Sequence, residues 1–409
     1  MVNISFVMWG LGGAGGELVI YRIADQLAKE GHTVNLIALV GWNYTGYNPT
    51  KHANVIIQPR FLHPLFSIEW LLEFNRKFKK FSWSTSLIYE INKTILRDLI
   101  KKVKSDVIIA TSWYTFIPAA LAGARYAFVQ DVVEAYYAND QWAGVRKYIQ
   151  KAFSSDFNFL SISSYTDNLI RSFNDEAKIY RIGYFIADEF FDVKYVKPSE
   201  RKRRILAIAR PANAYHKGLD ILIRAMRELY ARRRDFEVHI VNVDGVALGN
   251  LGFEYVEHPR LPWKELADLC ATSYVFVYTS RHESFGLPPV EAMATGTPVV
   301  MTRTEGSRDY GVHDYNSLIT DVGDYKKIAD YIEYLLDNPS EADRLSAGAL
   351  ETAKTFRFDS FIKRFKNAIG IELIAFKFRY KDESRNGIES KDFNGDEPEG
   401  SLGHYPTHV

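Results

Sequence analysis

Apolar runs and amphipathic stretches alternate from the start of the chain. Residues 4–8 are apolar, residues 10–16 are rich in glycine, and residues 18–29 carry apolar side chains at helical spacing. This order predicts a strand, a tight turn and a helix. Residues 33–40 are again apolar and predict a second, buried strand, so the chain is predicted to open with a βαβ unit.

The same alternation fills the rest of the first half. Strands that alternate with helices are typical of a parallel sheet covered on both faces. The pattern predicts helices at residues 87–104 and 165–173, and strands at residues 106–111, 126–130 and 159–163.

The pattern breaks at residues 186–204, a polar stretch with a basic run that predicts a solvated linker. After this stretch the alternation restarts. It predicts strands at residues 205–209, 236–241, 274–278 and 298–301, and helices at residues 218–232, 262–271, 288–294 and 325–337.

These patterns predict an α/β protein of two Rossmann-like, doubly wound parallel-sheet domains, at residues 1–185 and 205–355. Ligands of such sheets lie beyond the carboxyl ends of the strands, so we expect a cleft between the domains. Residues 356–380 predict an amphipathic helix that returns to the first domain. Residues 381–409 contain few apolar side chains and predict a mobile polar tail.

Composition excludes several classes of protein. The 51 Lys and Arg residues balance 50 Asp and Glu residues, so a net charge of +1 gives no electrostatic case for nucleic-acid binding. No uncharged apolar run reaches the roughly 18 residues of a membrane helix. The single cysteine, Cys270, excludes an intrachain disulfide framework and a cysteine-rich zinc site. We therefore expect a cytoplasmic protein.

The glycine cluster near the N-terminus is the first candidate site. Gly10, Gly12 and Gly15 satisfy G-x-G-x-x-G between a predicted strand and a predicted helix. A dinucleotide site also needs an acid at the end of the second strand, and that strand runs into Val40, Gly41 and Trp42 instead. Glycine amides at a helix N-terminus still suit an anion or a sugar oxygen. A tight structural turn is the alternative.

Two glutamates, Glu283 and Glu291, lie eight residues apart in SRHESFGLPPVEAMATGTPVV, after a predicted strand. They bracket a glycine and a helix start, where the Pro-Pro pair suits the first turn because no backbone donor is needed there. The amides of Gly286 and Leu287 then face an anion. Glu291, expected in the first turn, is placed to accept hydrogen bonds from a diol such as a ribose.

Two glutamates beside a diphosphate repel it unless cations hold the phosphates. Arg210 follows the first strand of the second domain, and Lys217 opens its first helix in ARPANAYHKGLD. Both lie at the predicted sheet edge that carries Glu283. An arginine fork and a lysine point charge suit a diphosphate. The alternative is two surface basic residues that flank a turn.

Together, ARPANAYHKGLDILIRA and TSRHESFGLPPVEAMATGTPVV resemble the retaining nucleotide-sugar glycosyltransferases of family 4, which have the GT-B fold and an E-x7-E signature. The resemblance covers most of residues 3–375. The segment VQDVVEAYY further resembles the rhamnan-synthesis branch of that family.

The resemblance implies a role for each matching residue. Arg210 and Lys217 would bind the donor diphosphate and stabilise the charge of the leaving group, and Glu283 would lie near the transferred sugar as a catalytic residue. Gln130 and Asp131 stand where the family often has a histidine. Asp131 is therefore expected to take over a catalytic or acceptor contact, with a buried turn aspartate as the alternative. The implied donor-binding set is Gly12, Gly13, Arg210, Lys217, Ser284, Phe285, Gly286, Leu287 and Glu291.

The reaction implied is transfer of a glycosyl group from a nucleotide-diphosphate sugar to a polysaccharide, glycolipid or similar acceptor, with the anomeric configuration retained. No cofactor is expected, and no metal, because the chain has no D-x-D triplet and the spaced pair His404 and His408 lies in the predicted tail. The expected partners are the donor and a glycan or lipid-linked acceptor, with no nucleic acid.

Two further surfaces are open to interpretation. The basic, aromatic residues 76–83 predict peripheral contact with the inner face of a membrane, or else a solvated helix face. Several aromatic side chains suit stacking on a sugar ring, or core packing instead: Trp42, Tyr44, Tyr47, Trp113 and Tyr114.

Other functions also fit parts of the pattern. A nucleotide-sugar epimerase or an NAD-linked oxidoreductase would use the glycine loop. A catalytically silent nucleotide-sugar-binding protein would keep the cleft without turnover.

Overall fold

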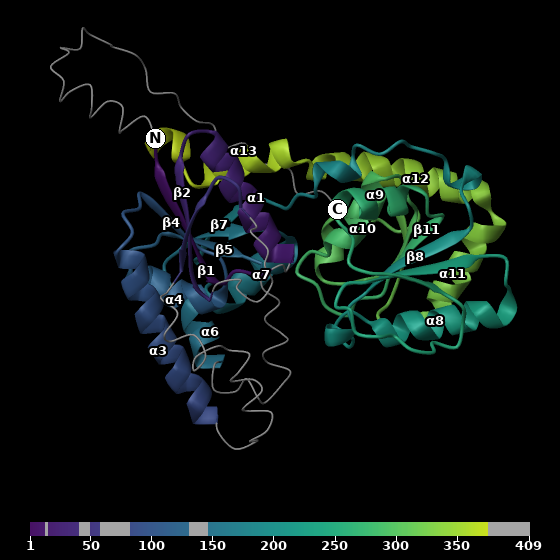
Figure 1. Ribbon diagram of the computed structural model, residues 1–409, viewed down its shortest axis with the longest axis horizontal. Coiled ribbons are helices and arrows are strands. Elements are labelled where there is room, and N and C mark those ends of the chain that lie inside the picture. The colour runs from purple at the N-terminus through teal and green to yellow at the C-terminus, as the bar shows by residue number, and fades with distance from the viewer. Residues whose placement is uncertain (13–14, 41–49, 58–81, 131–145, 375–409) are drawn as a thin grey trace, which may run out of the picture.

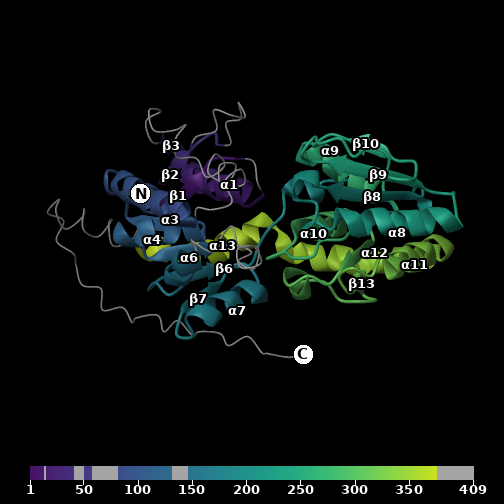
Figure 2. The ribbon, with the colours of Figure 1, turned by 90° about the horizontal axis from the view of Figure 1, so that it is seen from below.

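Two parallel sheets lie side by side along the length of the molecule, each with helices on both faces (Figures 1 and 2). The computed structural model describes residues 1–12, 15–40, 50–57, 82–130 and 146–374. The predicted α/β architecture of two Rossmann-like, doubly wound domains is confirmed.

The first sheet has seven parallel strands in the order β3-β2-β1-β4-β5-β6-β7. The chain winds outward in both directions from β1, so the switch in strand order falls between β1 and β4, where open sheets bind ligands. The strands are β1 Asn3–Gly10, β2 Thr33–Val40, β3 Asn54–Ile57, β4 Val107–Ala110, β5 Tyr126–Val129, β6 Asn158–Ser161 and β7 Lys178–Arg181.

The side chains of β1 alternate between two buried cores, which explains its apolar sequence. Ile4 and Phe6 pack into the core beneath helix α1, whereas Val7 packs into the core beneath helices α3 and α4. The helices of this domain are α1 Gly15–Lys29, α3 Ser82–Lys101, α4 Trp113–Leu121, α6 Arg146–Phe153 and α7 Ser164–Phe173.

The second sheet has six parallel strands in the order β10-β9-β8-β11-β12-β13, so its switch in strand order lies between β8 and β11. The strands are β8 Arg204–Ala209, β9 Glu237–Asn242, β10 Val256–His258, β11 Val275–Tyr278, β12 Val299–Thr302 and β13 Ser317–Thr320. The covering helices are α8 Leu219–Arg232, α9 Trp263–Ala271, α10 Leu287–Ala294, α11 Tyr325–Asp337 and α12 Pro339–Ala353.

The basic run before β8 is not fully solvated. The guanidinium of Arg201 is largely buried and donates hydrogen bonds to the carbonyl oxygens of Val196, Ser273 and Gly296 and to the hydroxyl of Thr297. Burial lowers the pKa of Arg201 to about 10. The prediction of a solvated basic run is therefore wrong at Arg201, which ties the incoming segment to the second domain.

After α12 the chain crosses back to the first domain. Helix α13 (Phe358–Ala368) lies against the first sheet (Figure 1). There the ring of Phe365 stacks on Phe6 with 6.2 Å between the ring centres. Arg364 also donates to the carbonyl of Ile182 at 2.7 Å. The C-terminal part of the described chain therefore packs on the first domain. The predicted tail at residues 381–409 lies outside the described residues.

Among the described residues, no helix combines the length and the apolar character that a membrane span requires.

Candidate functional site

Glu283 lies in the loop that connects strand β11 to helix α10, and Glu291 lies in the helix itself. We call residues 279–286 the glutamate loop. It ends at Gly286, which caps α10 with a φ of 85°. A Cβ atom at Gly286 would lie 2.7 Å from the hydroxyl of Tyr278, so only glycine fits this backbone and this space. Helix α10 begins at Leu287, and Pro288 and Pro289 have no N–H. The amide of Leu287 is therefore the one backbone donor among the first three positions of the helix.

The structure brings Lys217 and Glu283 together. The ammonium Nζ of Lys217 lies 2.5 Å from Oε1 of Glu283, and the hydroxyl of Ser280 donates to the same oxygen at 3.0 Å. The Glu283 carbonyl accepts from the amide of Gly306 at 3.0 Å. The carboxylate is therefore fixed by one cation and one hydroxyl, and its backbone is anchored to the next loop.

A close backbone contact puts Lys217 in this position. Gly218 caps helix α8 with a φ of 64°, and a Cβ atom there would overlap the carbonyl oxygen of Thr279. The hydroxyl of Thr279 donates to the carbonyl of Gly218 at 2.9 Å. The loop before α8 thus presses directly on the end of β11, because Gly218 has no side chain.

Arg210 leaves the end of β8 and pairs with a residue that the sequence analysis did not single out. Its Nε and Nη2 donate to Oδ1 of Asp244 at 3.2 and 3.1 Å, and the other oxygen of Asp244 accepts from the amide of Ala212 at 3.1 Å. Asp244 follows β9, the strand next to β8. Arg210 is therefore aimed by Asp244 and forms no contact with Glu283 or Glu291 in the structure.

Glu291 lies in the second turn of α10, not in the first turn as predicted, because the helix begins at Leu287. Its carboxylate forms no hydrogen bond or ion pair within the described part of the chain. Burial raises the pKa of Glu291 from its ordinary value of 4.5 to about 7. A half-buried carboxyl group without a donor is suited to accept hydrogen bonds from a ligand.

The glycine loop of the first domain reaches the same region. The carbonyl of Gly12 accepts from the Tyr21 hydroxyl at 3.2 Å, and a Cβ atom at Gly16 would lie 3.1 Å from Oε1 of Gln130. Gly16 therefore allows helix α1 to start directly beside the Gln130 side chain. The predicted site residues Gly13 and Asp131 lie outside the described residues.

Gln130 and Ser163 connect the first domain to the glutamate loop. The hydroxyl of Ser284 donates to the carbonyl of Gln130 at 2.9 Å, and the hydroxyl of Ser163 donates to the carbonyl of Ser284 at 2.6 Å. Tyr184 donates to Oε1 of Gln130 at 2.8 Å, and its ring stacks on Phe285. Residues from both domains thus meet at Ser284 and Phe285.

Some predicted residues lie elsewhere. Trp113 is fully buried in the first turn of α4, where its ring stacks on Tyr114 with 3.7 Å between the ring centres. Trp113 is therefore a core residue and not an exposed sugar platform. Trp42, Tyr44, Tyr47 and the side chains of the basic stretch at residues 76–83 lie outside the described residues.

Within the described ranges, no cluster of three or more His, Cys, Asp or Glu side chains has the arrangement of a metal site. His404 and His408 fall outside these ranges.

The second domain has recognisable relatives. Residues 191–352 match the family of glycosyl transferases group 1. This match contains Arg210, Lys217, Glu283 and Glu291. The D-inositol 3-phosphate glycosyltransferase of Nocardioides sp. is 31% identical over 167 residues, which cover 35% of this chain and 36% of that protein. The chain thus aligns with about a third of the length of this curated relative.

Solved structures of other proteins resemble both domains of this chain. Sucrose-phosphate synthase from Thermosynechococcus elongatus superposes with a TM-score of 0.68 at 16% identity, over 92% of this chain and all of that one. Anabaena Alr3699/HepE in complex with UDP-glucose gives a TM-score of 0.66 at 14% identity, with the same coverage. The protein therefore has the GT-B fold.

The match to glycosyl transferases group 1 covers one half of the candidate site. Lys217, Glu283 and Asp244 lie inside the matched segment, whereas Gln130 and Ser163 lie in the first domain, outside it. The likeness is thus strongest for the half of the site built on β8, β9 and β11.

Proposed function

We propose that the protein is a glycosyltransferase that transfers a sugar from a nucleoside-diphosphate donor to a hydroxyl group of a glycan, glycolipid or similar acceptor. One observation carries this proposal. Lys217 meets Glu283 at the start of helix α10, within the segment that matches glycosyl transferases group 1. A cation, a carboxylate and free helix amides at one sheet edge suit an anionic donor with a hydroxyl-rich sugar.

The diphosphate would lie against Arg210, Lys217 and the Leu287 amide. Its negative charge grows as the sugar leaves, and fixed cations and helix amides stabilise that charge without reorganisation. Because Asp244 already holds Arg210 on one side, the guanidinium is oriented before the donor binds. These protein cations supply the charge stabilisation, so we propose a transfer that needs no divalent metal.

The two glutamates would bind hydroxyl groups. Lys217 offsets the charge of Glu283, which allows this carboxylate to lie near the diphosphate and contact the transferred sugar. Glu291, which has no hydrogen-bond donor within the described residues, would accept from the ribose hydroxyls. A hydrogen bond to a charged carboxylate is stronger than one to a neutral oxygen.

In the proposed step, the bond between the sugar C1 and the diphosphate oxygen breaks, and the acceptor oxygen bonds to C1. The diphosphate oxygen leaves with the electron pair of the broken bond and takes up the proton of the acceptor hydroxyl. We propose retention of the anomeric configuration, as in the family that the motifs resemble. Asp131 and Gly13 remain predicted contacts of the acceptor side and the donor phosphate.

A panel assay tests this function. The protein is incubated with UDP-, GDP-, ADP- and dTDP-sugars, first in thermal-shift measurements and then with release of the nucleoside diphosphate as the readout. At about 100 times the dissociation constant, a donor stabilises the folded state by about 2.7 kcal/mol, which is visible as a raised Tm. We expect one donor class to stabilise the protein and to be hydrolysed slowly without an acceptor, with and without a chelator.

The outcomes separate the alternatives. Stabilisation by NAD and none by any nucleotide sugar would contradict the glycosyltransferase and favour an oxidoreductase. Epimerised free donor would indicate the epimerase. Binding without any turnover, even with acceptor sugars present, would indicate a nucleotide-sugar-binding protein.

A further inference from the structure

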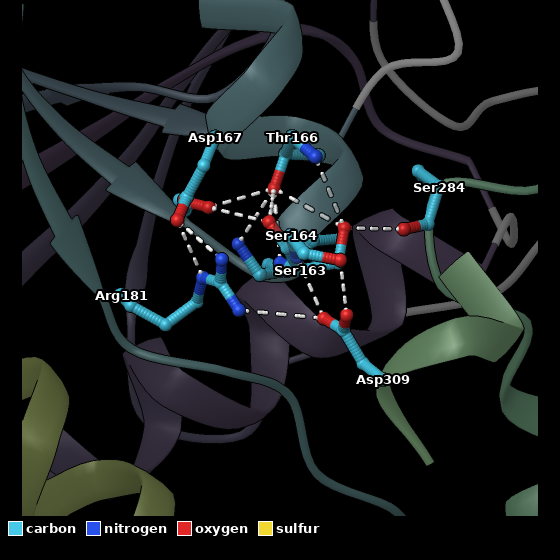
Figure 3. A network of polar contacts seen from close by, with 9 residues as sticks. Ser163, Ser164, Thr166, Asp167, Arg181, Ser284 and Asp309 are labelled. Atoms are coloured by element: carbon cyan, nitrogen blue, oxygen red, sulfur yellow. Dashed lines mark hydrogen bonds and ion pairs between the residues drawn. The ribbon is translucent and has the colours of Figure 1, made fainter. Parts of the chain in front are cut away.

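The first domain holds the second through the N-terminus of helix α7. Ser163 caps this helix, and the next residue, Ser164, donates from both its amide and its hydroxyl to the carboxylate of Asp309 in the second domain (Figure 3). The amide contact is 2.6 Å long. Arg181 lies 3.4 Å from the same carboxylate. A carboxylate is favoured here because the helix dipole and the guanidinium both attract negative charge.

The short helix that carries Asp309 packs directly against the glutamate loop. Asp309 ends this helix, Gly306–Asp309, whose first residue packs so tightly that a Cβ atom at Gly306 would overlap the backbone of Phe285. The amide of Gly306 also donates to the carbonyl of Glu283 at 3.0 Å. A shift of Asp309 would therefore displace the backbone that carries Glu283 and Phe285.

A second link leads from the first domain to the same loop. The hydroxyl of Ser163 donates to the carbonyl of Ser284 at 2.6 Å, and the hydroxyl of Ser284 donates to the carbonyl of Gln130 at 2.9 Å (Figure 3 shows the first of these bonds). Ser163 is buried, so water does not readily replace its bond to Ser284. We call the contacts of Ser163, Ser164 and Gln130 with Ser284 and Asp309 the interdomain junction.

We propose that Ser163 and Asp309 are positioning residues: through the interdomain junction, the first domain holds the glutamate loop in the geometry that Lys217, Glu283 and the Leu287 amide need to bind a diphosphate. This inference rests on the proposed glycosyltransferase function. Donor affinity of the second domain then depends on contact with the first. If only the closed junction binds the donor well, the apparent dissociation constant rises as the closed fraction falls.

Asp309→Asn tests this coupling in the full chain. The amide side chain keeps the size of Asp309 but loses the negative charge and one acceptor. The matched control is Asp314→Asn, since Asp314 also pairs with an arginine, Arg344, but lies outside the interdomain junction. The probes are UDP and inorganic pyrophosphate in calorimetry, and the radius of gyration is measured by small-angle scattering.

We expect Asp309→Asn to increase the radius of gyration and to weaken binding of the probes about tenfold, while Asp314→Asn changes neither. Saturating probe should return the radius of gyration of Asp309→Asn to that of the wild type, because coupling between binding and closure is reciprocal. A merely structural role would lower the Tm of the variant without this recovery.

Ser163→Gly tests the second link. Glycine is an acceptable helix N-cap, so this change costs helix α7 only a few tenths of a kcal/mol. It removes the donor to Ser284. We expect weaker probe binding with a Tm close to that of the wild type.

The outcomes distinguish this inference from the proposed function. If the wild type binds a probe through Lys217, but Asp309→Asn binds it within twofold of Asp314→Asn, the positioning role is wrong and the function stands. If the wild type binds neither probe, the proposed function fails. If the radius of gyration of Asp309→Asn equals that of the wild type, Asp309 does not hold the two domains together, whether or not a probe binds.

Discussion

At the scale of single residues, Glu291 is a carboxyl group of the candidate site whose charged form is disfavoured by burial. Its pKa is raised to about 7 by burial, with no opposing donor within the described residues. In the unfolded chain the same carboxyl ionises near its ordinary value of 4.5. The folded state thus binds a proton that the unfolded state has released between these two pH values, and stability falls as the pH rises through that range.

Glu291→Gln should remove this pH dependence. The shift of the pKa corresponds to roughly 3 kcal/mol of unfolding free energy, so the variant should gain up to that amount relative to the wild type between about pH 5 and pH 8. Denaturant unfolding of both proteins at pH 5 and pH 8 measures this difference in unfolding free energy. Equal pH dependence in the two proteins would show that Glu291 ionises normally.

Ligand binding provides a second readout of the same residue. Because ribose hydroxyls bind the charged carboxylate best, the affinity of the wild type for a nucleoside diphosphate, relative to pyrophosphate, should rise through about pH 7. Glu291→Gln should lack this rise. Equal losses for both ligands in Glu291→Gln would contradict the ribose role.

The sequence patterns predicted which residues follow the strands. They did not predict the side chains that pair with these residues. Lys217 and Glu283 meet because each follows a strand of one parallel sheet, and the carboxyl ends of such strands share an edge. The partner of Arg210, Asp244, depends on β9 lying beside β8, which a sequence pattern does not specify. Its position after a predicted strand was the available signal. Trp113 was a candidate for sugar stacking because an indole ring suits both a core and a sugar-binding surface.

At the scale of elements, Gly218 decides how closely the loop before α8 approaches the end of β11. Gly323 is a matched control for Gly218, because both glycines have a positive φ. A Cβ atom at Gly323 would meet nothing within 4 Å. Gly218→Ala and Gly323→Ala share the cost of the left-handed backbone, about 1–2 kcal/mol. Only Gly218→Ala adds the overlap with Thr279.

We therefore expect Gly218→Ala to unfold at a clearly lower denaturant concentration than Gly323→Ala and to bind nucleoside diphosphates more weakly, because Lys217 is displaced. Gly323→Ala should bind as the wild type does. Similar stability and affinity for the two variants would show that the contact between Gly218 and Thr279 does not position Lys217.

The interior strands and the periodic helices were predictable, and the edge strands were not. Helices α1, α8 and α11 show clear amphipathic spacing, and the central strands are uninterrupted apolar runs. The edge strands β3, β7, β10 and β13 were not predicted, although β3 is as long as the predicted interior strands β4 and β5. Helix α12 was not predicted because its apolar positions are mostly alanine, which carries a weak periodic signal.

At the scale of the whole molecule, the contacts between domains were beyond the reach of the sequence. Asp309 and Ser164 are 145 residues apart, and their contact depends on how two finished domains pack. The return of helix α13 to the first domain was easier to predict, because an amphipathic helix needs an apolar surface to cover. Asp131 and Gly13 stay predictions.

The net charge of +1 also has a consequence at this scale. The molecule has no strong overall field to attract an anion, so recognition of a diphosphate must come from a few local cations. Donor recognition therefore depends most on Lys217, which links the β8 side of the site to Glu283.

Calorimetry with Lys217→Ala tests this most directly. The control is Lys354→Ala, since Lys354 also pairs with a glutamate at 2.5 Å but on an exposed surface. Hydrogen bonds to charged groups contribute about 1.5–3 kcal/mol, so Lys217→Ala should weaken binding of the nucleoside diphosphate by roughly tenfold to a hundredfold. Lys354→Ala should bind as the wild type does. Equal affinities for the two variants would contradict the account.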